Sequence, residues 1–503
     1  MTRIRRVLVA NRGEIALRIV RACHEEGLEA IAVYSDVDRL APYVRAADDA
    51  VPLGGAAPSE SYLRGDRLIA AAREAACEAV HPGYGFLSER ADFARAVEAA
   101  GLTFVGPPWQ AIAAMGEKTE ARRRMRAAGV PVVPGSLHTL ATAADAARAA
   151  AEVGYPVMFK AAAGGGGRGM RVVNDEGAVE GAFQAAASEA RKAFGDGSIY
   201  LERYVDRPRH IEVQVLADAA GRVAAVGERE CSIQRRHQKL IEEAPSPAVD
   251  VPLRARLAEA ACAAARAVGY RSAGTIEFLL APDQSFYFLE MNTRIQVEHP
   301  VTEEVYGVDL VREQLRIAAG ATLELPAVLE PQGHAIECRI TAEDPFAGFV
   351  PATGRLAYLR IPGGPGVRWD GGLEAGNDVT RHYDSLVGKL VAWAESRPAA
   401  IQRMRRALRE LIIVGVPTSQ PFHLRVMDEP SFARGDVDIT YVDRTGRSVL
   451  EAPLDVERLR AAAVAAALLA EEARGQPGAG WSGGDARRHS AWAAAGRRDA
   501  LRE

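Results

Sequence analysis

The sequence predicts a multidomain protein in which an α/β region is followed by α+β and β-rich regions. In the first ~110 residues, short apolar runs alternate with amphipathic helical patterns. After about residue 205, the apolar runs become strand-like pairs separated by turn signals. A length of 503 residues allows about two to four domains. Hydrophobic residues make up 48% and charged residues 25%, as is ordinary for globular proteins.

The N-terminal region begins with a parallel strand–helix–strand unit. Residues 7–11 (VLVAN) read as a short buried strand, 14–27 as an amphipathic helix ending at Gly27, and 29–35 as a second strand. Strands at this spacing pair in parallel through a crossover helix. Residues 71–107 continue the pattern, so we expect an open Rossmann-like sheet. The first strand is followed by NRGE rather than GxGxxG, which argues against a dinucleotide site.

The rest of the chain divides by pattern into four further parts. Residues 111–130 look like one helix, and PVVPG follows as a connector into a small α+β unit. Strand patterns recur at 211–218, 275–281 and 285–292, before a β-rich stretch that runs from HAIECRITAED to VGKLVAWA. An Ala- and Arg-rich tail ends the chain, with one helix expected at 457–474. The expected domains are 1–115, 116–204, 205–330, 331–446 and 447–503.

Composition and charge narrow the class of protein. The net charge of −4 gives no electrostatic case for a nucleic-acid or anionic membrane partner. The N-terminus has an apolar run too short for a signal peptide, and no run approaches the ~20 residues of a spanning helix. The five cysteines form no CxxC pair, which argues against zinc and a disulfide framework. We therefore expect a cytoplasmic protein with no nucleic-acid or membrane partner.

Lysine is rare in this chain. The 62 basic side chains include only five lysines, so the bias toward arginine is strong. A compact, rotatable ammonium does what a planar guanidinium cannot, so most of these lysines are site candidates. One or two could remain by chance. The five are Lys118, Lys160, Lys192, Lys239 and Lys389.

A glycine-rich loop lies between two strand-like segments, in VMFKAAAGGGGRGMRVV (157–173). This strand–loop–strand context does not fit a dinucleotide fingerprint, and GK[ST] of a Walker loop is missing. Consecutive glycines let backbone amides point at an anion with no side chain in the way. Lys160, just before the loop, could meet the same phosphates. The alternative is a mobile surface hairpin.

The segment TIEFLLAPDQSFYFLEMN predicts an antiparallel hairpin with its turn at APDQS. If the hairpin folds between Asp283 and Gln284, Glu277 lies opposite Glu290 and Thr275 opposite Asn292. Two carboxylates ~5 Å apart repel unless a cation sits between them. The oxygen ligands of Glu277, Glu290 and Asn292 suit Mg²⁺ or Mn²⁺, with phosphates and water completing the shell. The alternative is a solvated face with two unrelated glutamates.

The stretch FLEMNTRIQVEH (288–299) splits into two faces when read as an extended segment. One face is entirely polar, and it is either solvated or the floor of a site. Its members are Glu290, Asn292, Arg294, Gln296 and Glu298.

A basic cluster in RECSIQRRHQK brings together Arg235, Arg236, His237 and Lys239. It could be a solvated loop or a nucleic-acid patch. Because one of the rare lysines is present and the chain is negative elsewhere, an anion-facing loop is favoured.

Together these segments resemble the ATP-grasp superfamily and, within it, the biotin carboxylase family. The resemblance runs from about residue 3 to 446. It rests on ANRGEIALRI, HPGYGFLSE, KAAAGGGGRGMR, RRHQK, EEAPSP, FLEMNTRIQVEHPVTE, ECRI with AEDP, and YDSLVGKL. The resemblance implies that ATP is held between a small lid within 116–204 and the central domain, 205–330.

The resemblance also implies residue roles in nucleotide binding. Lys118 and Lys160 would meet the phosphates under the glycine loop, where Gly165, Gly166 and Gly167 stand. The remaining nucleotide contacts would be Glu202 and Val205 at the adenine, with His210, Gln234 and His237. Glu277 and Glu290, with Asn292 beside them, would hold two Mg²⁺ or Mn²⁺ ions.

The chemistry that the resemblance implies is carboxylation of biotin by bicarbonate, driven by ATP. Arg294 would hold bicarbonate as a bidentate ion pair, helped by Gln296, the backbone of Val297 and Lys239. With Glu298 as general base, bicarbonate would attack the γ-phosphorus to give carboxyphosphate and ADP. Carboxyphosphate would break down to CO₂ and phosphate, and the phosphate would take the ureido proton of biotin. Arg339 would stabilise negative charge on the ureido oxygen.

Biotin is expected to arrive on another protein. No lysine here has a neighbouring methionine, as a biotinylated lysine would, and the chain ends too early for an appended carboxyltransferase. The expected partners are a biotin carboxyl carrier protein, carboxyltransferase subunits of an acyl-CoA carboxylase (acetyl-CoA first, in fatty acid biosynthesis) and a second copy. Two alternatives stay open: another bicarbonate-phosphorylating ATP-grasp ligase, and a catalytically silent ATP-binding regulator.

For three other residues we predict no role in binding or catalysis. Cys231 is expected to be a packed thiol rather than a nucleophile, Lys192 a solvated helix lysine, and Lys389 a structural residue of the β-rich region.

Overall fold

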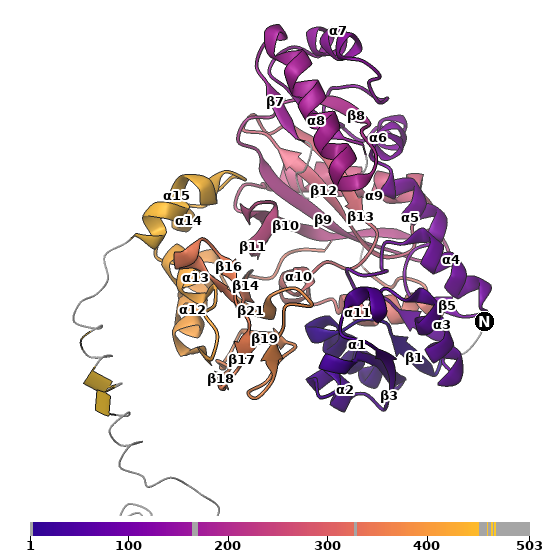
Figure 1. Cartoon of the computed structure of the whole chain (residues 1–503), viewed down its shortest axis with the longest axis vertical. Coiled ribbons are helices and arrows are strands. Elements are labelled where there is room, and N and C mark those ends of the chain that lie inside the picture. The colour runs from indigo at the N-terminus through magenta and orange to yellow at the C-terminus, as the bar shows by residue number, and fades with distance from the viewer. Residues whose placement is uncertain are drawn as a thin grey trace, which may run out of the picture. The chain divides into compact units, whose positions relative to one another are not determined.

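The N-terminal region contains a five-stranded parallel sheet in the order β3-β2-β1-β4-β5 (Figure 1). The computed structural model describes residues 4–162, 170–325 and 329–451, plus residues 460, 464, 465, 467 and 468. The strands are β1 (Arg6–Val9), β2 (Glu29–Ser35), β3 (Asp49–Gly54), β4 (Ala79–His81) and β5 (Thr103–Phe104). The predicted Rossmann-like sheet is confirmed.

Helices connect these strands, as parallel pairing requires. They are α1 (Gly13–Glu25), α2 (Pro42–Ala46), α3 (Gly65–Glu74) and α4 (Ala91–Ala99). The helix predicted over 111–130 is wrong as a single element, because the chain forms α5 (Trp109–Gly116) and α6 (Lys118–Ala127). Glu117 between them is extended, with φ −99° and ψ 114°. The break makes Lys118 the first residue of α6.

The α+β unit after α6 has a three-stranded antiparallel sheet in the order β7-β6-β8. Its strands are β6 (Val157–Ala161), β7 (Arg171–Val173) and β8 (Ile199–Arg203). Helices α7 (Ala143–Val153) and α8 (Val179–Phe194) complete the unit, and a capping box between Thr142 and Asp145 starts α7. The glycine loop predicted between β6 and β7, with Gly165, Gly166 and Gly167, lies outside the described residues.

An eight-stranded sheet, in the order β13-β12-β9-β10-β11-β14-β21-β19, crosses the expected boundary between 330 and 331. Its pairs are antiparallel throughout. The strands are β9 (Arg209–Ala217), β10 (Val223–Arg235), β11 (Gln238–Ala244), β12 (Ser272–Leu280), β13 (Phe286–Asn292), β14 (His334–Thr341), β19 (Val367–Gly371) and β21 (Leu386–Ala394). Strands predicted far apart in sequence thus share one surface. The expected domain boundaries stay predictions.

The remaining elements surround this sheet. The helices are α9 (Val251–Ala267), α10 (His299–Tyr306), α11 (Leu310–Ala318), α12 (Arg397–Glu410), α13 (Gln420–Val426), α14 (Pro430–Arg434) and α15 (Tyr441–Leu450). The short strands are β15 (Glu343–Asp344), β16 (Val350–Pro351), β17 (Gly354–Arg355), β18 (Tyr358–Arg360), β20 (Asp378–Val379) and β22 (Ile412–Val414).

The predicted hairpin register is confirmed where it matters for the site. Glu277 pairs with Glu290 and Thr275 with Asn292. Beyond Glu277 the register shifts, so that Phe278 pairs with Phe288 and Leu289 is the extra residue of a bulge. The bulge leaves the two glutamates directly opposite each other on one face of the sheet.

The stretch 288–299 does not stay extended to its end, contrary to the prediction. Strand β13 ends at Asn292, residues 293–298 form bends and a turn, and α10 begins at His299. Pro300 favours this helix start because its missing N–H costs nothing in the first turn. The polar side chains therefore reach one site through a turn, and Val297 joins them.

The core joins the N-terminal helix to the turn that carries the site. Ile15 and Ile19 of α1 pack in one buried cluster with Ile295, Val301 and Leu315. The chain divides into two units, residues 1–450 and residues 451–503. Within the tail helix predicted at 457–474, the five described residues are helical and the others lie outside the described part. Among the described residues, no helix combines the length and apolarity needed to span a membrane.

Candidate active site

One cavity of about 450 Å³ collects every predicted site residue that the structure describes. It lies between the three-stranded unit and the eight-stranded sheet, because its lining comes from β6 and β8 on one side and from β9 to β14 on the other. The predicted residues that line it are Lys118, Lys160, Glu202, Val205, His210, Gln234, His237, Lys239, Glu277, Glu290, Asn292, Arg294, Gln296, Val297, Glu298 and Arg339.

At the three-stranded unit, Glu202 is held by two cations. Lys160 Nζ lies 2.5 Å from Glu202 Oε2, and Arg122 of α6 pairs with Oε1. All three side chains are buried. Lys118 lines the same cavity, and burial lowers its pKa. Arg122 was not among the predicted site residues, since α6 carries several arginines and periodicity does not separate the buried one.

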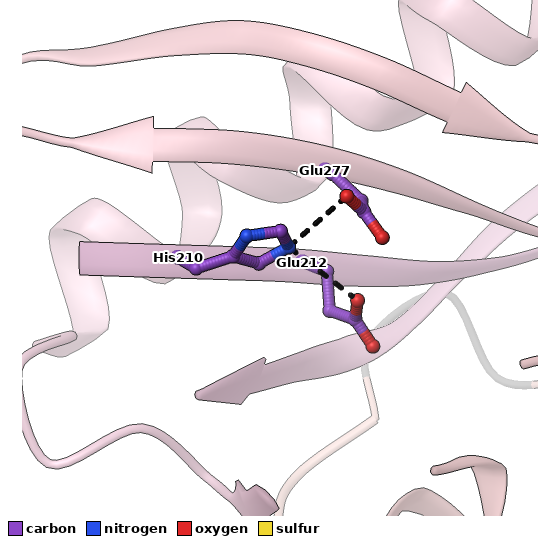
Figure 2. Close-up of side chains that lie close together, drawn as sticks. All are labelled: His210, Glu212 and Glu277. Carbon is purple, nitrogen blue, oxygen red and sulfur yellow. Dashed lines mark ion pairs between the residues drawn. The ribbon is translucent and has the colours of Figure 1, made fainter. Parts of the chain in front are cut away.

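Glu277 is the centre of a hydrogen-bond network on the sheet floor. Its Oε1 accepts from Lys239 Nζ at 3.0 Å, Asn292 Nδ2 at 2.9 Å and Gln296 Nε2 at 3.0 Å. Its other oxygen lies 3.1 Å from His210 Nε2 (Figure 2). Burial disfavours the charged imidazole, but Glu277 raises the pKa of His210 above its usual value. Glu277 is thus ionised, and both of its carboxylate oxygens contact hydrogen-bond donors.

The residues present fit a hard divalent cation. Glu277 and Glu290 are cross-strand partners, Asn292 is two residues from Glu290, and all three line the cavity. Carboxylate and amide oxygens are the donors that Mg²⁺ and Mn²⁺ prefer. Glu290 is solvent-exposed in the cavity while Glu277 is buried, so an ion entering from the cavity would meet both.

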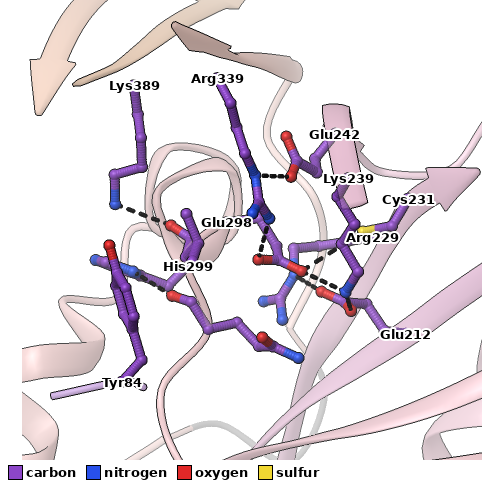
Figure 3. A network of polar contacts seen from close by, with 12 residues as sticks. Tyr84, Glu212, Arg229, Cys231, Lys239, Glu242, Glu298, His299, Arg339 and Lys389 are labelled. Atoms are coloured by element: carbon purple, nitrogen blue, oxygen red, sulfur yellow. Dashed lines mark hydrogen bonds and ion pairs between the residues drawn. The ribbon is translucent and has the colours of Figure 1, made fainter. Parts of the chain in front are cut away.

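Lys239 lies among three buried carboxylates, two of which, Glu212 and Glu298, are labelled in Figure 3. Its Nζ lies 2.5 Å from Glu212 Oε2 and 2.5 Å from Glu298 Oε1, besides its contact with Glu277. Burial opposes the charge on this lysine, yet the three carboxylates raise its pKa well above the usual value. Glu212 was not among the predicted site residues. Its signal was the alternation of His210, Glu212 and Gln214 along β9.

Glu298 is fully buried and surrounded by cations. Arg339 donates from its NH2 group to Oε2 at 2.9 Å, opposite Lys239 on Oε1. Burial alone would raise the pKa of Glu298, but Lys239, Arg339 and Arg229 lower it well below normal. Arg339 also donates from Nε to Glu242 at 2.6 Å. One guanidinium therefore joins two buried carboxylates.

Arg294 is oriented by four hydrogen-bond acceptors, one of which is the Ile295 carbonyl at 3.2 Å. It donates to Glu89 Oε2 at 2.9 Å, Gln296 Oε1 at 2.8 Å and Asn292 Oδ1 at 3.1 Å. Glu89 belongs to the HPGYGFLSE motif, in which no role was predicted for this glutamate. Its contact crosses from the N-terminal region to the sheet.

The basic cluster at 235–239 divides between two environments. His237 and Lys239 line the cavity, whereas Arg235 and Arg236 do not. Arg235 instead donates to the Gly348 carbonyl at 2.8 Å and lies over the Phe349 ring, 4.8 Å from its centroid. The anion-facing loop that was predicted therefore does not include Arg235, because cation–π and carbonyl contacts hold this side chain elsewhere.

The three residues predicted to have no role in binding or catalysis are Cys231, Lys192 and Lys389. Cys231 is buried, burial raises the pKa of its thiol well above normal, and its Sγ lies 3.9 Å from Glu298. It is thus a packed thiol rather than a nucleophile. Lys192 is exposed on α8. Lys389 is completely buried.

A lid-like α+β unit facing a sheet that carries paired carboxylates defines an ATP-grasp enzyme. Comparison with protein families agrees over most of the chain. Residues 3–112 match the biotin carboxylase N-terminal domain, 117–326 the ATP-binding domain of the carbamoyl-phosphate synthase L chain, and 337–444 the biotin carboxylase C-terminal domain. The chain belongs to the biotin carboxylase family and is an ATP-dependent carboxylase.

Individual relatives support this placement. The chain is 52% identical to the biotin carboxylase of Nostoc sp. over 445 residues, covering 88% of this chain and 99% of the relative. It is 50% identical to a pyruvate carboxylase subunit of Methanothermobacter thermautotrophicus over 445 residues, covering 88% and 90%.

Solved structures show the same fold. A biotin carboxylase–beta-gamma-ATP complex from Campylobacter jejuni aligns with a TM-score of 0.85 at 49% identity, covering 88% of this chain and 99% of that one. The biotin carboxylase domain dimer of Hydrogenobacter thermophilus 2-oxoglutarate carboxylase, with MgADP, ADP and bicarbonate, aligns with a TM-score of 0.86 at 45% identity, covering 90% and 100%.

Proposed function

We propose that this carboxylase uses ATP and bicarbonate to carboxylate biotin presented by a separate carrier protein. The observation that carries the proposal is the convergence of two charge sets in one cavity. Glu277, Glu290 and Asn292 form the oxygen-donor set, and Lys239, Arg294, Gln296, Glu298 and Arg339 lie beside it. An ion-holding pair next to cations and a buried carboxylate suits phosphoryl transfer to a small anion.

ATP is assigned to the space between the three-stranded unit and the sheet. Lys118 and Lys160 would meet its phosphates, the glycine loop at 165–167 would cover them, and Glu202 and Val205 would meet the adenine. His210, Gln234 and His237 would line the nucleotide. The ATP complex of the Campylobacter relative and the MgADP complex of the Hydrogenobacter relative support this assignment.

Mg²⁺ is the cation that we assign to Glu277, Glu290 and Asn292, with Mn²⁺ as a substitute. When bound, it would neutralise charge on the phosphates of the nucleotide. Lys239, which now contacts Glu277, would be free to meet the phosphate or bicarbonate once that charge is shared. The MgADP-bound relative supports the choice of metal.

Bicarbonate is assigned to Arg294, Gln296 and the backbone of Val297. Arg294 is already oriented by Glu89, so its fork is pre-organised for an anion. A bicarbonate oxygen attacks the γ-phosphorus, the bond to ADP breaks, and Glu298 accepts the bicarbonate proton. The bicarbonate-bound Hydrogenobacter relative supports an anion site in this family.

Glu298 would gain basicity as the substrates bind. Its low pKa is due to Lys239 and Arg339, which hold its two oxygens. Substrate phosphate and the ureido oxygen of biotin would draw these cations away. The Glu298 carboxylate is therefore a weak base before the substrates bind and a stronger base in the complex. Arg339 then stabilises the negative charge that develops on the ureido oxygen.

The acceptor of the carboxyl group is proposed to be an acyl-CoA, with acetyl-CoA first, which would place the chain in fatty acid biosynthesis. A second candidate is a 2-oxo acid, since relatives of similar identity are named as pyruvate and 2-oxoglutarate carboxylases. The chain purified with its carrier and transferase partners distinguishes the two. Transfer of ¹⁴C from bicarbonate to acetyl-CoA supports the first candidate, and transfer to pyruvate or 2-oxoglutarate supports the second.

Partners are a carrier protein, carboxyltransferase subunits and a second copy of the chain. The dimer is supported by the dimeric Hydrogenobacter domain. It is also supported by exposed apolar side chains on the β18–β22 pair, where Tyr358 is 50%, Ile412 39% and Val414 49% exposed. Sedimentation equilibrium of the purified chain tests the dimer.

The activity is tested by measuring ADP release with and without bicarbonate and free biotin. The expected result is release that depends on bicarbonate and is stimulated by biotin. Glu290→Gln, which removes one metal-facing charge, should lower it by at least about 100-fold. Asp283→Asn, in the exposed hairpin turn, is the matched control and should leave it unchanged. ADP release at the same rate with and without bicarbonate would overturn the proposal.

A further inference from the structure

Lys389 of β21 is a completely buried lysine that the proposed reaction does not use. Its Nζ donates to the backbone carbonyl of Val297 at 2.8 Å. It also lies 3.1 Å from Glu14 Oε1 of α1 and 3.9 Å from Asp370 Oδ2 of β19. One ammonium therefore joins the N-terminal helix, the β-rich region and the turn that carries the assigned bicarbonate site.

The contact with Val297 controls the direction of a peptide group. In a trans peptide the C=O of one residue and the N–H of the next point to opposite sides. The Val297–Glu298 bond is trans. Because Lys389 holds the Val297 carbonyl on its own side, the Glu298 N–H is directed away from Lys389.

A second buried donor acts on the preceding peptide. His299 Nδ1 lies 2.7 Å from the Gln296 carbonyl, so this nitrogen carries the proton and donates it (Figure 3 shows His299 and Lys389 on the same side of Glu298). Burial lowers the pKa of His299 well below normal, which keeps the ring neutral. The Gln296 carbonyl is thereby fixed, and the Val297 N–H points the other way.

Both amide donors are unused among the described residues. In the part of the chain that the structure describes, neither the Val297 N–H nor the Glu298 N–H donates a hydrogen bond to another residue. Val297 and Glu298 both line the cavity beside Arg294 and Gln296. Two adjacent amides with fixed direction and no acceptor among these residues form a concave donor pair for an anion.

We propose that Lys389 is a positioning residue for bicarbonate: it orients the Val297–Glu298 peptide so that the two amides face the anion beside Arg294. This rests on the proposed function. Lysine suits the position because its compact ammonium meets the Val297 carbonyl and Glu14 at once, which a planar guanidinium cannot do in the same volume. That explains a lysine here in a chain that otherwise favours arginine.

Buried acidic side chains surround Lys389, so the effect of replacing Lys389 alone would be ambiguous. Glu14 is buried and bonded to Tyr84, and Glu337 is a second buried acid whose oxygens have no hydrogen-bond partner among the described residues. Burial raises the pKa of both carboxyl groups, although Lys389 opposes the rise. Removing Lys389 alone would leave buried acids unbalanced and could prevent folding.

The test therefore uses two variants of the full-length chain, Lys389→Met and Lys389→Met with Glu14→Gln. The second removes the ammonium together with its nearest acidic neighbour, so it is the variant expected to keep the fold while the Val297 carbonyl loses its donor. Lys192→Met, an exposed lysine on α8, is the matched control. Bicarbonate-dependent ADP release gives KM values for bicarbonate and for ATP, and equilibrium dialysis gives the Kd of MgADP.

We expect the KM for bicarbonate to rise at least about tenfold in the folded Lys389 variants, since one misdirected donor to an anion costs that much or more. The KM for ATP and the Kd of MgADP should stay within about twofold of the unmodified chain. A merely structural role would change all three together. A folded double variant with an unchanged KM for bicarbonate would overturn the inference.

Measurements on the unmodified chain distinguish a wrong role for Lys389 from a wrong proposed function. If it releases ADP only with bicarbonate while the double variant matches it, only the role of Lys389 is wrong. If the unmodified chain shows no dependence on bicarbonate, the proposed function itself fails and the inference fails with it.

Discussion

At the scale of single residues, the site is a set of mutually neutralising buried charges. Lys160, Lys239 and Arg339 each contact at least one buried carboxylate before any substrate is present. Such pairs cost desolvation, and removing one partner leaves the other uncompensated. The charges of incoming phosphates and bicarbonate can replace these internal partners, which makes the arrangement suited to binding anions.

Replacing Arg339 with lysine tests the assigned role of its planar fork. Lysine keeps the charge between Glu242 and Glu298 but cannot serve both carboxylates and a ureido oxygen. We expect biotin-stimulated ADP release to fall at least about 100-fold. The Kd of MgADP should stay unchanged, and the control is Arg409→Lys, at an exposed residue of α12. Full biotin stimulation in Arg339→Lys would refute the role.

Glu242 should make stability depend on pH. Burial raises its pKa from 4.5 to about 7, with Arg339 opposing and Glu298 adding to the rise. The folded chain thus keeps a proton that the unfolded chain releases near pH 4.5, so stability from this group is present at low pH and declines as pH rises toward 7.

The variant Glu242→Gln removes that titration while keeping an oxygen acceptor for Arg339. The thermal midpoint of the variant, relative to the unmodified chain, should therefore be higher at pH 8 than at pH 5. An identical difference at the two pH values would show that Glu242 does not titrate in this range.

At the scale of elements, close packing of α10 on β10 holds the turn that carries the site. Gly227 of β10 has φ +77°, and a Cβ there would overlap the ring of Tyr306. Tyr306 is the last residue of α10, whose first residue is His299. Glycine is therefore required at this position for two reasons, backbone conformation and space.

Gly227→Ala should destabilise the protein by about 3 kcal/mol or more, because left-handed strain adds to overpacking. Gly221→Ala is a matched control, since it has φ +86° but open space around its Cβ. That control should lose only about 1–2 kcal/mol. Urea unfolding of both variants measures the difference. Equal decreases in the free energy of unfolding would mean that the Tyr306 ring moves aside without destabilising the protein.

At the scale of the whole molecule, the site depends on contacts between distant parts of the chain. Arg294 is oriented by Glu89, Lys389 by Glu14, and Arg339 contacts Glu242. The buried cluster that contains Ile15, Ile19 and Ile295 fixes the N-terminal region against the site turn. The cavity is lined by the three-stranded unit, the large sheet and the site turn, and the N-terminal region packs against that turn.

Nucleotide binding should therefore stabilise the molecule as a unit. A ligand at 100 times its Kd adds about 2.7 kcal/mol to the free energy of unfolding. We expect MgADP to raise the thermal midpoint, because it would contact Lys160 on one side and Glu277 on the other. ADP with EDTA should raise it less, since the assigned metal ligands would repel the phosphates. Equal shifts with and without metal would argue against the metal assignment.

Local patterns predicted much of this structure. The alternation of strands and helices predicted the parallel N-terminal sheet, and the turn APDQS predicted the pairing of Glu277 with Glu290. These predictions succeed because periodicity and turn chemistry act over a few residues. The helix at 111–130 and the extended stretch to residue 299 were wrong, because the chain is extended at Glu117 and turns at 293–298, and hydrophobic periodicity does not reveal such single-residue breaks.

The sequence alone determined the family resemblance, and with it the candidate site residues and the chemistry that their types suggest. Only the tertiary structure decided which groups they contact. Arg122 pairs with Glu202, Lys239 with Glu212 and Arg294 with Glu89, and Lys389 donates to the Val297 carbonyl. The physical reason is that side-chain periodicity is a local property of the chain. Electrostatic pairing depends on distance in space, and the fold brings these partners together from separate elements.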